Sequence, residues 1–140
     1  MAINIFGEEY ISSHEYAKMI IREGYKKPFL KLVYYPENAD FYYAKLFDIL
    51  DDKGKPVVLS DCGGMYAIYR KIGNKLECLY AGQSYTNIRR RLFRYMTELA
   101  DVKDTGGHSG ARKARENGVK PTDELLVKVL TNREIAKIYR

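Results

Sequence analysis

Two short motifs of glycine and tyrosine lie close together in this 140-residue sequence. They are Gly64-Met65-Tyr66 and Tyr80-Ala81-Gly82, and each stands inside an apolar run. A cluster of arginines follows them, made up of Arg89, Arg90, Arg91 and Arg94. Tyrosine hydroxyls form hydrogen bonds, and an arginine guanidinium is permanently charged and can bind two phosphate oxygens at once. Residues 63–96 therefore predict a place that holds a phosphate group.

The two motifs are expected to lie on neighbouring strands. The residues that alternate with smaller or polar partners are Tyr66, Ile68, Leu76, Cys78 and Tyr80. A period of two residues is that of a β-strand. Gly73-Asn74 between the two runs supplies a turn that tolerates positive φ. We therefore expect a β-hairpin that brings both tyrosines to one end of a small sheet.

The arginines are predicted to lie on a helix that begins after its cap, Asn87. The apolar residues of this helix fall on one stripe, which consists of Ile88, Leu92, Tyr95, Met96 and Leu99. At about 100° per residue, Arg90 and Arg94 point away from the stripe, and a solvated helix face would account for both. Arg89 and Arg91 lie at its borders, so both could reach inward past the core.

Further elements are predicted on either side of this stretch. A basic helix is expected from Ser109 to Asn117, followed by a third strand at 124–130 and a final helix that begins at Thr131. Nothing in the first 60 residues indicates catalysis.

The N-terminal part contains signals for three elements. Ser12 and Glu15 have the spacing of a capping box and predict a first helix. Residues 29–35 predict a strand, and residues 40–50 predict a second helix capped by Asp40.

Composition and charge limit the class of protein. Hydrophobic residues make up 46% and charged residues 30%, as in ordinary globular proteins, and the net charge of +6 moderately favours a polyanionic partner. Cys62 and Cys78 have neither a metal-binding spacing nor that of a disulfide framework. We find no apolar run long enough to span a membrane, and expect a cytoplasmic protein without a membrane partner. At this length we expect one core domain, residues 63–140, with residues 1–62 as an N-terminal α/β extension packed on it.

The ordered set of motifs in residues 63–140 resembles the GIY-YIG nuclease family. Gly64-Met65-Tyr66 and Tyr80-Ala81-Gly82 look like its two name motifs, with Met and Ala in place of the usual isoleucines. The family then has an arginine on the next helix, with a histidine or tyrosine four residues further on. Arg91 and Tyr95 match that pair.

Two further features bear on this resemblance. The loop before the arginine helix is slightly longer than is usual in the family, so Arg90 is an alternative to Arg91. His108-Ser109 and the basic helix after it are similar to a stretch found in the homing-endonuclease branch of the family.

The resemblance implies an α+β fold, a small three-stranded antiparallel sheet flanked by helices, and hydrolysis of a DNA phosphodiester with one Mg²⁺ (or Mn²⁺) ion. Arg91 would neutralise the phosphoryl oxygens. Tyr66 would position or deprotonate the attacking water, although a tyrosine with an ordinary pKa near 10 needs nearby cations for this. Tyr80 and Tyr95 would orient phosphate or water. His108 would contact the phosphate or assist proton transfer.

DNA is the partner that the resemblance implies, and the basic residues around the site are candidates for contacts with its backbone. These candidates are Arg89, Arg90, Arg94, Arg112, Lys113 and Arg115.

The metal ligand of the family is a glutamate on the helix after the third strand. Glu134 is the only carboxylate between Thr131 and Arg140, which makes it the candidate. Thr131 and Glu134 also have the spacing of a capping box. In relatives the ligand tends to lie a turn or more further along, which here falls beyond Arg140. Two hypotheses therefore stay open: a metal-dependent DNA endonuclease, and a DNA-binding module of the same fold that lacks the metal ligand.

Overall fold

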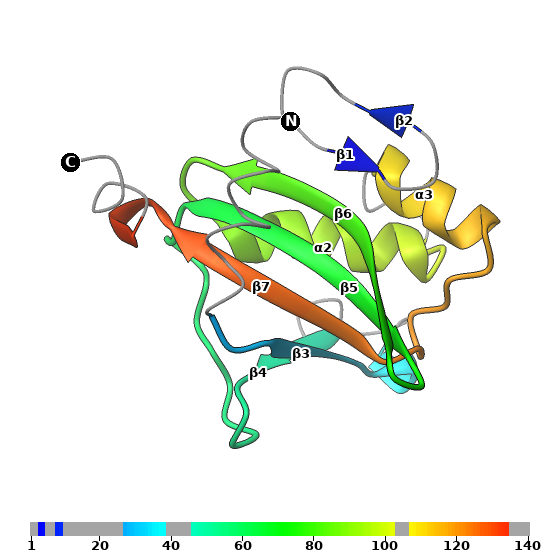
Figure 1. Ribbon diagram of the computed structural model, residues 1–140, viewed down its shortest axis with the longest axis horizontal. Coiled ribbons are helices and arrows are strands. Elements are labelled where there is room, and N and C mark those ends of the chain that lie inside the picture. Colours follow the sequence, from blue (N-terminus) through cyan, green and yellow to red (C-terminus); the bar gives the residue numbers. More distant parts are fainter. Residues whose placement is uncertain (1–2, 5–7, 10–26, 39–45, 103–106, 135–140) are drawn as a thin grey trace.

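The computed structural model describes residues 3–4, 8–9, 27–38, 46–102 and 107–134 (Figure 1). Two very short strands come first, β1 (Ile3–Asn4) and β2 (Glu8–Glu9). The other elements are β3 (Leu30–Tyr34), a short 3-10 helix η3 (Pro36–Asn38), β4 (Phe47–Leu50), β5 (Gly64–Ile72), β6 (Lys75–Ser84), α2 (Ile88–Leu99), α3 (Ser109–Glu116) and β7 (Leu125–Thr131).

All the described strands pair antiparallel in one sheet of seven strands, in the order β2-β1-β6-β5-β7-β3-β4. The predicted α+β class is confirmed, and the hairpin β5–β6 with β7 forms the centre of the sheet. The predicted size of three strands is wrong, because β3 continues the sheet beyond β7 and β1 pairs with β6. Six of the seven β7 residues are buried, since this strand has neighbours along both edges.

The hairpin places the two motifs side by side. Its turn is at Gly73-Asn74 as predicted, and Gly73 has a φ of +57°. Tyr66 stands opposite Gly82, and Ile68 stands opposite Tyr80. A β-bulge after Ile68 shifts the register, and beyond it Tyr69 pairs with Cys78.

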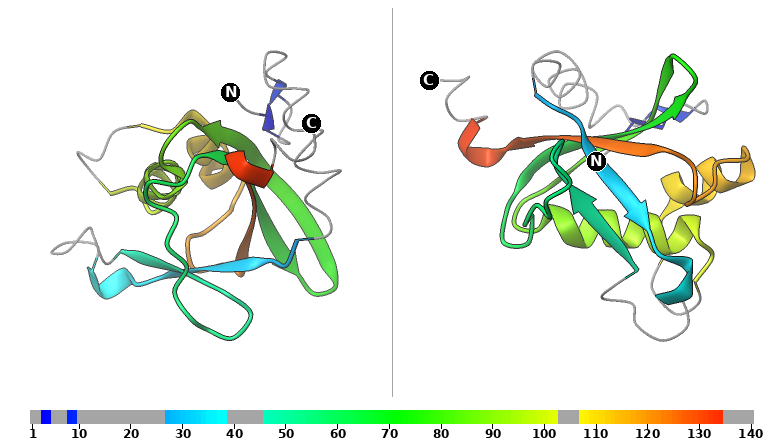
Figure 2. Two further views of the ribbon diagram at one scale, coloured as in Figure 1. Left: turned by 90° about the vertical axis from the view of Figure 1, so that its left-hand side faces the viewer. Right: turned by 90° about the horizontal axis from the view of Figure 1, so that it is seen from below.

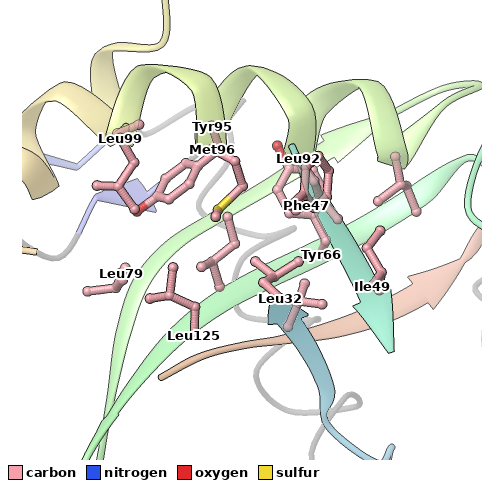
Figure 3. Close-up of a cluster of buried hydrophobic side chains, with 14 of the residues drawn as sticks. Leu32, Phe47, Ile49, Tyr66, Leu79, Leu92, Tyr95, Met96, Leu99 and Leu125 are labelled. Atoms are coloured by element: carbon pink, nitrogen blue, oxygen red, sulfur yellow. The ribbon is translucent and has the colours of Figure 1, made fainter. Parts of the chain in front are cut away.

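Helices α2 and α3 cover one face of the sheet (Figures 1 and 2). The Oδ1 atom of Asn87 accepts a hydrogen bond from the backbone nitrogen of Arg90 at 2.9 Å, so the predicted cap is confirmed. The apolar stripe of α2 is buried against the sheet, where Figure 3 shows it meeting side chains from β3, β4, β5, β6 and β7. Ala111 and Ala114 bring α3 into the same core.

The second predicted helix, residues 40–50, is wrong where the structure describes it, because Phe47–Leu50 is strand β4. Burial alternates along this segment: Phe47 and Ile49 are buried, and Asp48 and Leu50 are half-buried. Phe47 packs against Phe93 of α2, with 6.5 Å between ring centroids. Residues 39–45 and the first predicted helix, from Ser12, lie outside the described residues.

Strands β3 and β4 come from the predicted N-terminal extension and belong to the same sheet as residues 64–131. The boundary between residues 62 and 63 stays a prediction. Among the described helices, none combines the length and apolar character needed to cross a membrane.

The first glycine of the first motif generates a stability prediction. Gly64 has a φ of +152°, and a Cβ atom there would lie 2.2 Å from the carbonyl oxygen of Leu130. We expect Gly64→Ala to lower the free energy of unfolding by about 2–4 kcal/mol, because unfavourable φ and a backbone clash act together. Urea denaturation measures this.

Gly54→Ala is the matched control. Gly54 has a φ of +79°, but a Cβ atom there would meet no heavy atom within 4 Å. Its loss should stay near 1 kcal/mol. Equal losses in the two variants would show that crowding by β7 has no effect.

Candidate active site

The structure brings four of the predicted site residues into one aromatic cluster, which consists of Tyr66, Tyr80, Tyr95 and His108. The ring of Tyr80 is central: its centroid lies 6.2 Å from that of Tyr66, 5.7 Å from Tyr95 and 4.7 Å from His108. Tyr95 and His108 are 5.1 Å apart. Figure 3 shows Tyr66 on β5 and Tyr95 on α2 projecting into the layer between sheet and helix.

Two glycines make room for this cluster. A Cβ atom on Gly82 would lie 2.9 Å from the Tyr66 hydroxyl oxygen and 2.9 Å from the Tyr80 ring. A Cβ atom on Gly110 would lie 2.6 Å from the Tyr80 ring. The role of Gly110 was not predicted from the sequence. The sequence does contain a sign of this role: Gly110 lies inside the predicted basic helix, where glycine is less favourable than alanine by about 1 kcal/mol.

His108 is the N-terminal cap of α3. Its Nδ1 atom accepts a hydrogen bond from the backbone nitrogen of Ala111 at 3.1 Å, so Nδ1 carries no proton and Nε2 does. Burial lowers the pKa of His108 to about 4, and the positive charge of Arg91 adds to this effect. At neutral pH, His108 is therefore an uncharged hydrogen-bond donor through Nε2.

Tyr66 and Tyr95 are almost completely buried. Burial raises the pKa of Tyr66 well above its ordinary value of 10, and the charge of Arg91 opposes this rise only in part. Burial likewise raises the pKa of Tyr95. Both hydroxyls are protonated at neutral pH. The Tyr95 hydroxyl finds no hydrogen-bond partner among the described residues, and its side chain is 0% exposed, so Tyr95 packs behind Tyr80 and His108.

Three arginines of α2 line a cavity of about 220 Å³, together with Thr86 and Asn87. We call it the arginine pocket; its arginines are Arg90, Arg91 and Arg94. None of the three forms an ion pair within the described residues. Arg91 and Arg94 both act on the pKa of His108, and Arg91 also acts on that of Tyr66. Arg91 lies one helical turn before Tyr95 on α2, so the pocket is next to the aromatic cluster and can hold an anion.

The other basic candidates have different surroundings. The guanidinium of Arg89 lies 4.7 Å above the Phe47 ring, as a cation–π contact. Arg112 and Arg115 pair with Glu98 at 3.2 and 2.9 Å, and Arg115 also lies 3.3 Å from Asp101. Both arginines of α3 thus fasten this helix to the end of α2. Lys113 on the same helix is half-buried.

Glu98 of α2 is the carboxylate that binds α3 to the end of α2. Burial alone would raise the pKa of Glu98, but hydrogen bonds from the His108 backbone nitrogen and from Arg115 and Arg112 outweigh it, and the pKa is lowered. The sequence analysis missed Glu98, because its partners lie 10 to 17 residues away along the chain.

Glu134 forms the capping box that its spacing from Thr131 allows. The backbone nitrogen and the hydroxyl of Thr131 each donate to Glu134 Oε1 at 3.1 Å, and the Glu134 nitrogen donates to Thr131 Oγ1 at 3.2 Å. Lys27 pairs with the other carboxylate oxygen. Burial would raise the pKa of Glu134, but these donors, Lys27 foremost, lower it.

The described residues do not fit a metal site as they stand. Both oxygens of Glu134 already accept from donors of the protein. In the part of the chain that the structure describes, no three acidic, histidine or cysteine side chains gather in a group that could hold an ion.

The lowered pKa of His108 predicts a pH-dependent stability. Between its ordinary pKa of 6.5 and about 4, the unfolded chain binds the proton and the folded chain does not. The free energy of unfolding should therefore fall as pH drops from about 6.5 to 4, by up to about 3 kcal/mol. Asparagine also caps helices but does not titrate, so His108→Asn should flatten this part of the pH profile. Urea unfolding across the range measures it, and an equally steep profile in the variant would contradict the assignment.

Comparisons with known proteins do not place the chain in a family. No protein-family model, no curated protein and no solved structure matches it. A function for this site is therefore inferred from its residues and their geometry.

Proposed function

We propose that the chain is a DNA endonuclease that binds a phosphodiester at the arginine pocket and hydrolyses it with Mg²⁺ or Mn²⁺. The observation that carries the proposal is the position of the arginine pocket, whose three arginines form no ion pair among the described residues and share helix α2 with Tyr95 of the aromatic cluster. The proposed partner is DNA, and the proposed compartment is the cytoplasm, which suits two free cysteines.

The arginine pocket favours a phosphate for an electrostatic reason. Arg90 and Arg94 are four residues apart on α2, and Arg91 and Arg94 are three apart, so their charges face one another. Such like-charged pairs destabilise a helix by about 0.2–0.5 kcal/mol each. A phosphate group removes this repulsion and accepts hydrogen bonds from two guanidinium nitrogens at once.

A phosphate on Arg91 would be next to the groups that the reaction needs. Arg91 would neutralise charge on the phosphoryl oxygens. The Nε2–H of His108 and the hydroxyl of Tyr66 would donate hydrogen bonds to those oxygens or to the attacking water, and Tyr80 would orient them. The raised pKa of Tyr66 favours this donor role over that of a general base.

A cation-dependent reaction follows from the family resemblance, and Glu134 is the proposed ligand. Because its oxygens are already engaged, we assign the cation no step. The same observation favours a second candidate function, a DNA-binding module that does not cleave. In both functions, Arg90 and Arg94 contact the DNA backbone at the pocket, and Arg89, Arg112, Lys113 and Arg115 are proposed outer contacts.

The proposal predicts that Arg91→Ala reduces the cleavage rate of a supercoiled plasmid by about two to three orders of magnitude. The fold should survive, because Arg91 is exposed and has no ion-pair partner among the described residues. Arg112→Ala is the matched control and should change the rate less than about tenfold, because Arg112 is held by Glu98. If Arg90→Ala is inactive and Arg91→Ala is active, Arg90 takes the catalytic position.

A second prediction separates the two roles of Glu134. Thr131→Ala disrupts the capping box and should lower the free energy of unfolding by about 1 kcal/mol. Glu134→Gln keeps an oxygen that can accept from Thr131, so the capping box survives in this variant. Only Glu134→Gln removes the carboxylate. Plasmid cleavage is then measured with and without Mg²⁺ or Mn²⁺.

We expect the unaltered chain to cleave only with the cation. A loss of cleavage confined to Glu134→Gln would establish Glu134 as the ligand. Equal activity of the two variants would leave it as a cap alone. DNA binding without cleavage by the unaltered chain would overturn the endonuclease in favour of the binding module.

A further inference from the structure

Tyr85 is the most exposed large hydrophobic side chain among the described residues, at 85%. Its backbone is nevertheless firmly held. The side-chain nitrogen of Asn132 donates to the Tyr85 carbonyl oxygen at 3.1 Å, and a Cβ atom on Gly63 would lie 1.9 Å from that oxygen. One residue earlier, Ser84 Oγ accepts a hydrogen bond from the Asn87 nitrogen at 3.1 Å. The ring is thus presented to solvent by an anchored loop.

This ring stands at the wall of a second cavity, of about 630 Å³, next to the arginine pocket. The residues that line the second cavity are Asp61, Cys62, Gly63, Tyr85, Thr86, Thr131, Asn132 and Arg133. Thr86 also lines the arginine pocket, so the two hollows share a wall. We call Tyr85, the second cavity and the arginine pocket together the Tyr85 surface.

The Tyr85 surface combines the two features that bind single-stranded nucleic acids. These are an aromatic ring on which a base can stack and a cationic groove that follows the backbone. Arg90 and Arg94 are separated by about 6 Å along α2, so the cations cover a short length of backbone. Within a duplex the base faces are occupied by their neighbours, and Tyr85 could stack only on a base that has left the stack.

We propose that the Tyr85 surface binds an unpaired nucleotide of a DNA strand, with the base stacked on Tyr85 and the adjoining phosphate in the arginine pocket. The inference rests on the proposed function and narrows its substrate class. The preferred substrates are strands with unpaired nucleotides next to the cleaved phosphate, such as flaps, gaps or single-stranded ends. An ordinary continuous duplex offers the phosphate but no base face.

Arguments from charge decide against a protein partner for this surface. Three arginines without ion-pair partners in the described residues line the neighbouring arginine pocket, and they would have to be desolvated against an apolar protein face. A nucleic acid strand instead brings one negative charge with each base.

The test uses the full chain and two fluorescent DNA probes. One is a single strand with an aminopurine base, and the other is the same strand in a continuous duplex. Tyr85→Ala should weaken binding of the single strand by roughly 5- to 100-fold and remove the quenching of the aminopurine. It should change binding of the duplex less than about twofold. Tyr85→Phe keeps the ring and should behave like the unaltered chain, whereas Tyr85→Leu keeps the bulk only and should resemble Tyr85→Ala.

Thermal unfolding checks that the variants fold, which is expected because the ring is exposed. If Tyr85→Ala weakens both probes equally or neither, the inference is overturned while the proposed function stands. If the unaltered chain binds neither probe at low salt, the proposed function fails, and this inference with it. If Tyr85→Ala abolishes self-association of the chain and leaves DNA binding unchanged, Tyr85 is a protein contact and the inference is wrong.

Discussion

The close approach of helix α3 to the Tyr80 ring is the contact on which the candidate site depends. It is possible only because Gly110 has no side chain, and Gly82 provides the equivalent space on the strand side. With α3 at this distance, His108 reaches Tyr80 and Tyr95 while it caps its own helix. A side chain at Gly110 would move His108 away from the cluster. The geometry of the imidazole is therefore set by this packing together with its hydrogen bond from the Ala111 nitrogen.

Electrostatics then divides the basic residues into two groups. Glu98 pairs with Arg112 and Arg115 and accepts a hydrogen bond from the His108 backbone nitrogen. Much of the basic charge of α3 therefore holds that helix on α2. The arginine pocket has no such acceptor in the described part of the chain. In the described part of the chain, three arginines without ion-pair partners thus lie together on α2, beside buried hydrogen-bond donors. Burial keeps those donors uncharged, so among the described residues that line the pocket the charges facing a bound anion are those of the arginines.

The sequence correctly predicted those elements that are stabilised by interactions between residues close together in the chain. The hairpin follows from alternation and a Gly-Asn turn, and helix α2 follows from its stripe and its Asn87 cap. Strand β4 was mispredicted as helix, because the four residues Phe47–Leu50 are too few to distinguish the two periods. Their pairing with β3 and the contact of Phe47 with Phe93 decide the outcome, and neither is visible in the local sequence.

The site was predicted to a similar extent and for the same reason. Spacing predicted that Tyr66 and Tyr80 meet on a hairpin, because strand register is fixed over short distances. Tyr95 and His108 were added to the site by the family resemblance. Burial could not be read from the spacings. Tyr95 lies on the core side of its helix with an unpaired hydroxyl, so its position supports the neighbouring rings instead of presenting a donor to solvent. Glu98 of α2 pairs with Arg112 and Arg115 of α3, and such a contact between two helices is not visible in the local sequence.

Glu134 shows how one carboxylate can be limited by its surroundings. One oxygen completes the first turn of the last helix and the other pairs with Lys27. A divalent cation at this carboxylate would have to displace the lysine ammonium or open the capping box, and each change exposes a donor that is now satisfied. The lowered pKa of Glu134 keeps it ionised for either partner, so protonation does not decide between them. Competition between the cation and Lys27 would decide, and it would link cation binding to the position of Lys27, just before β3.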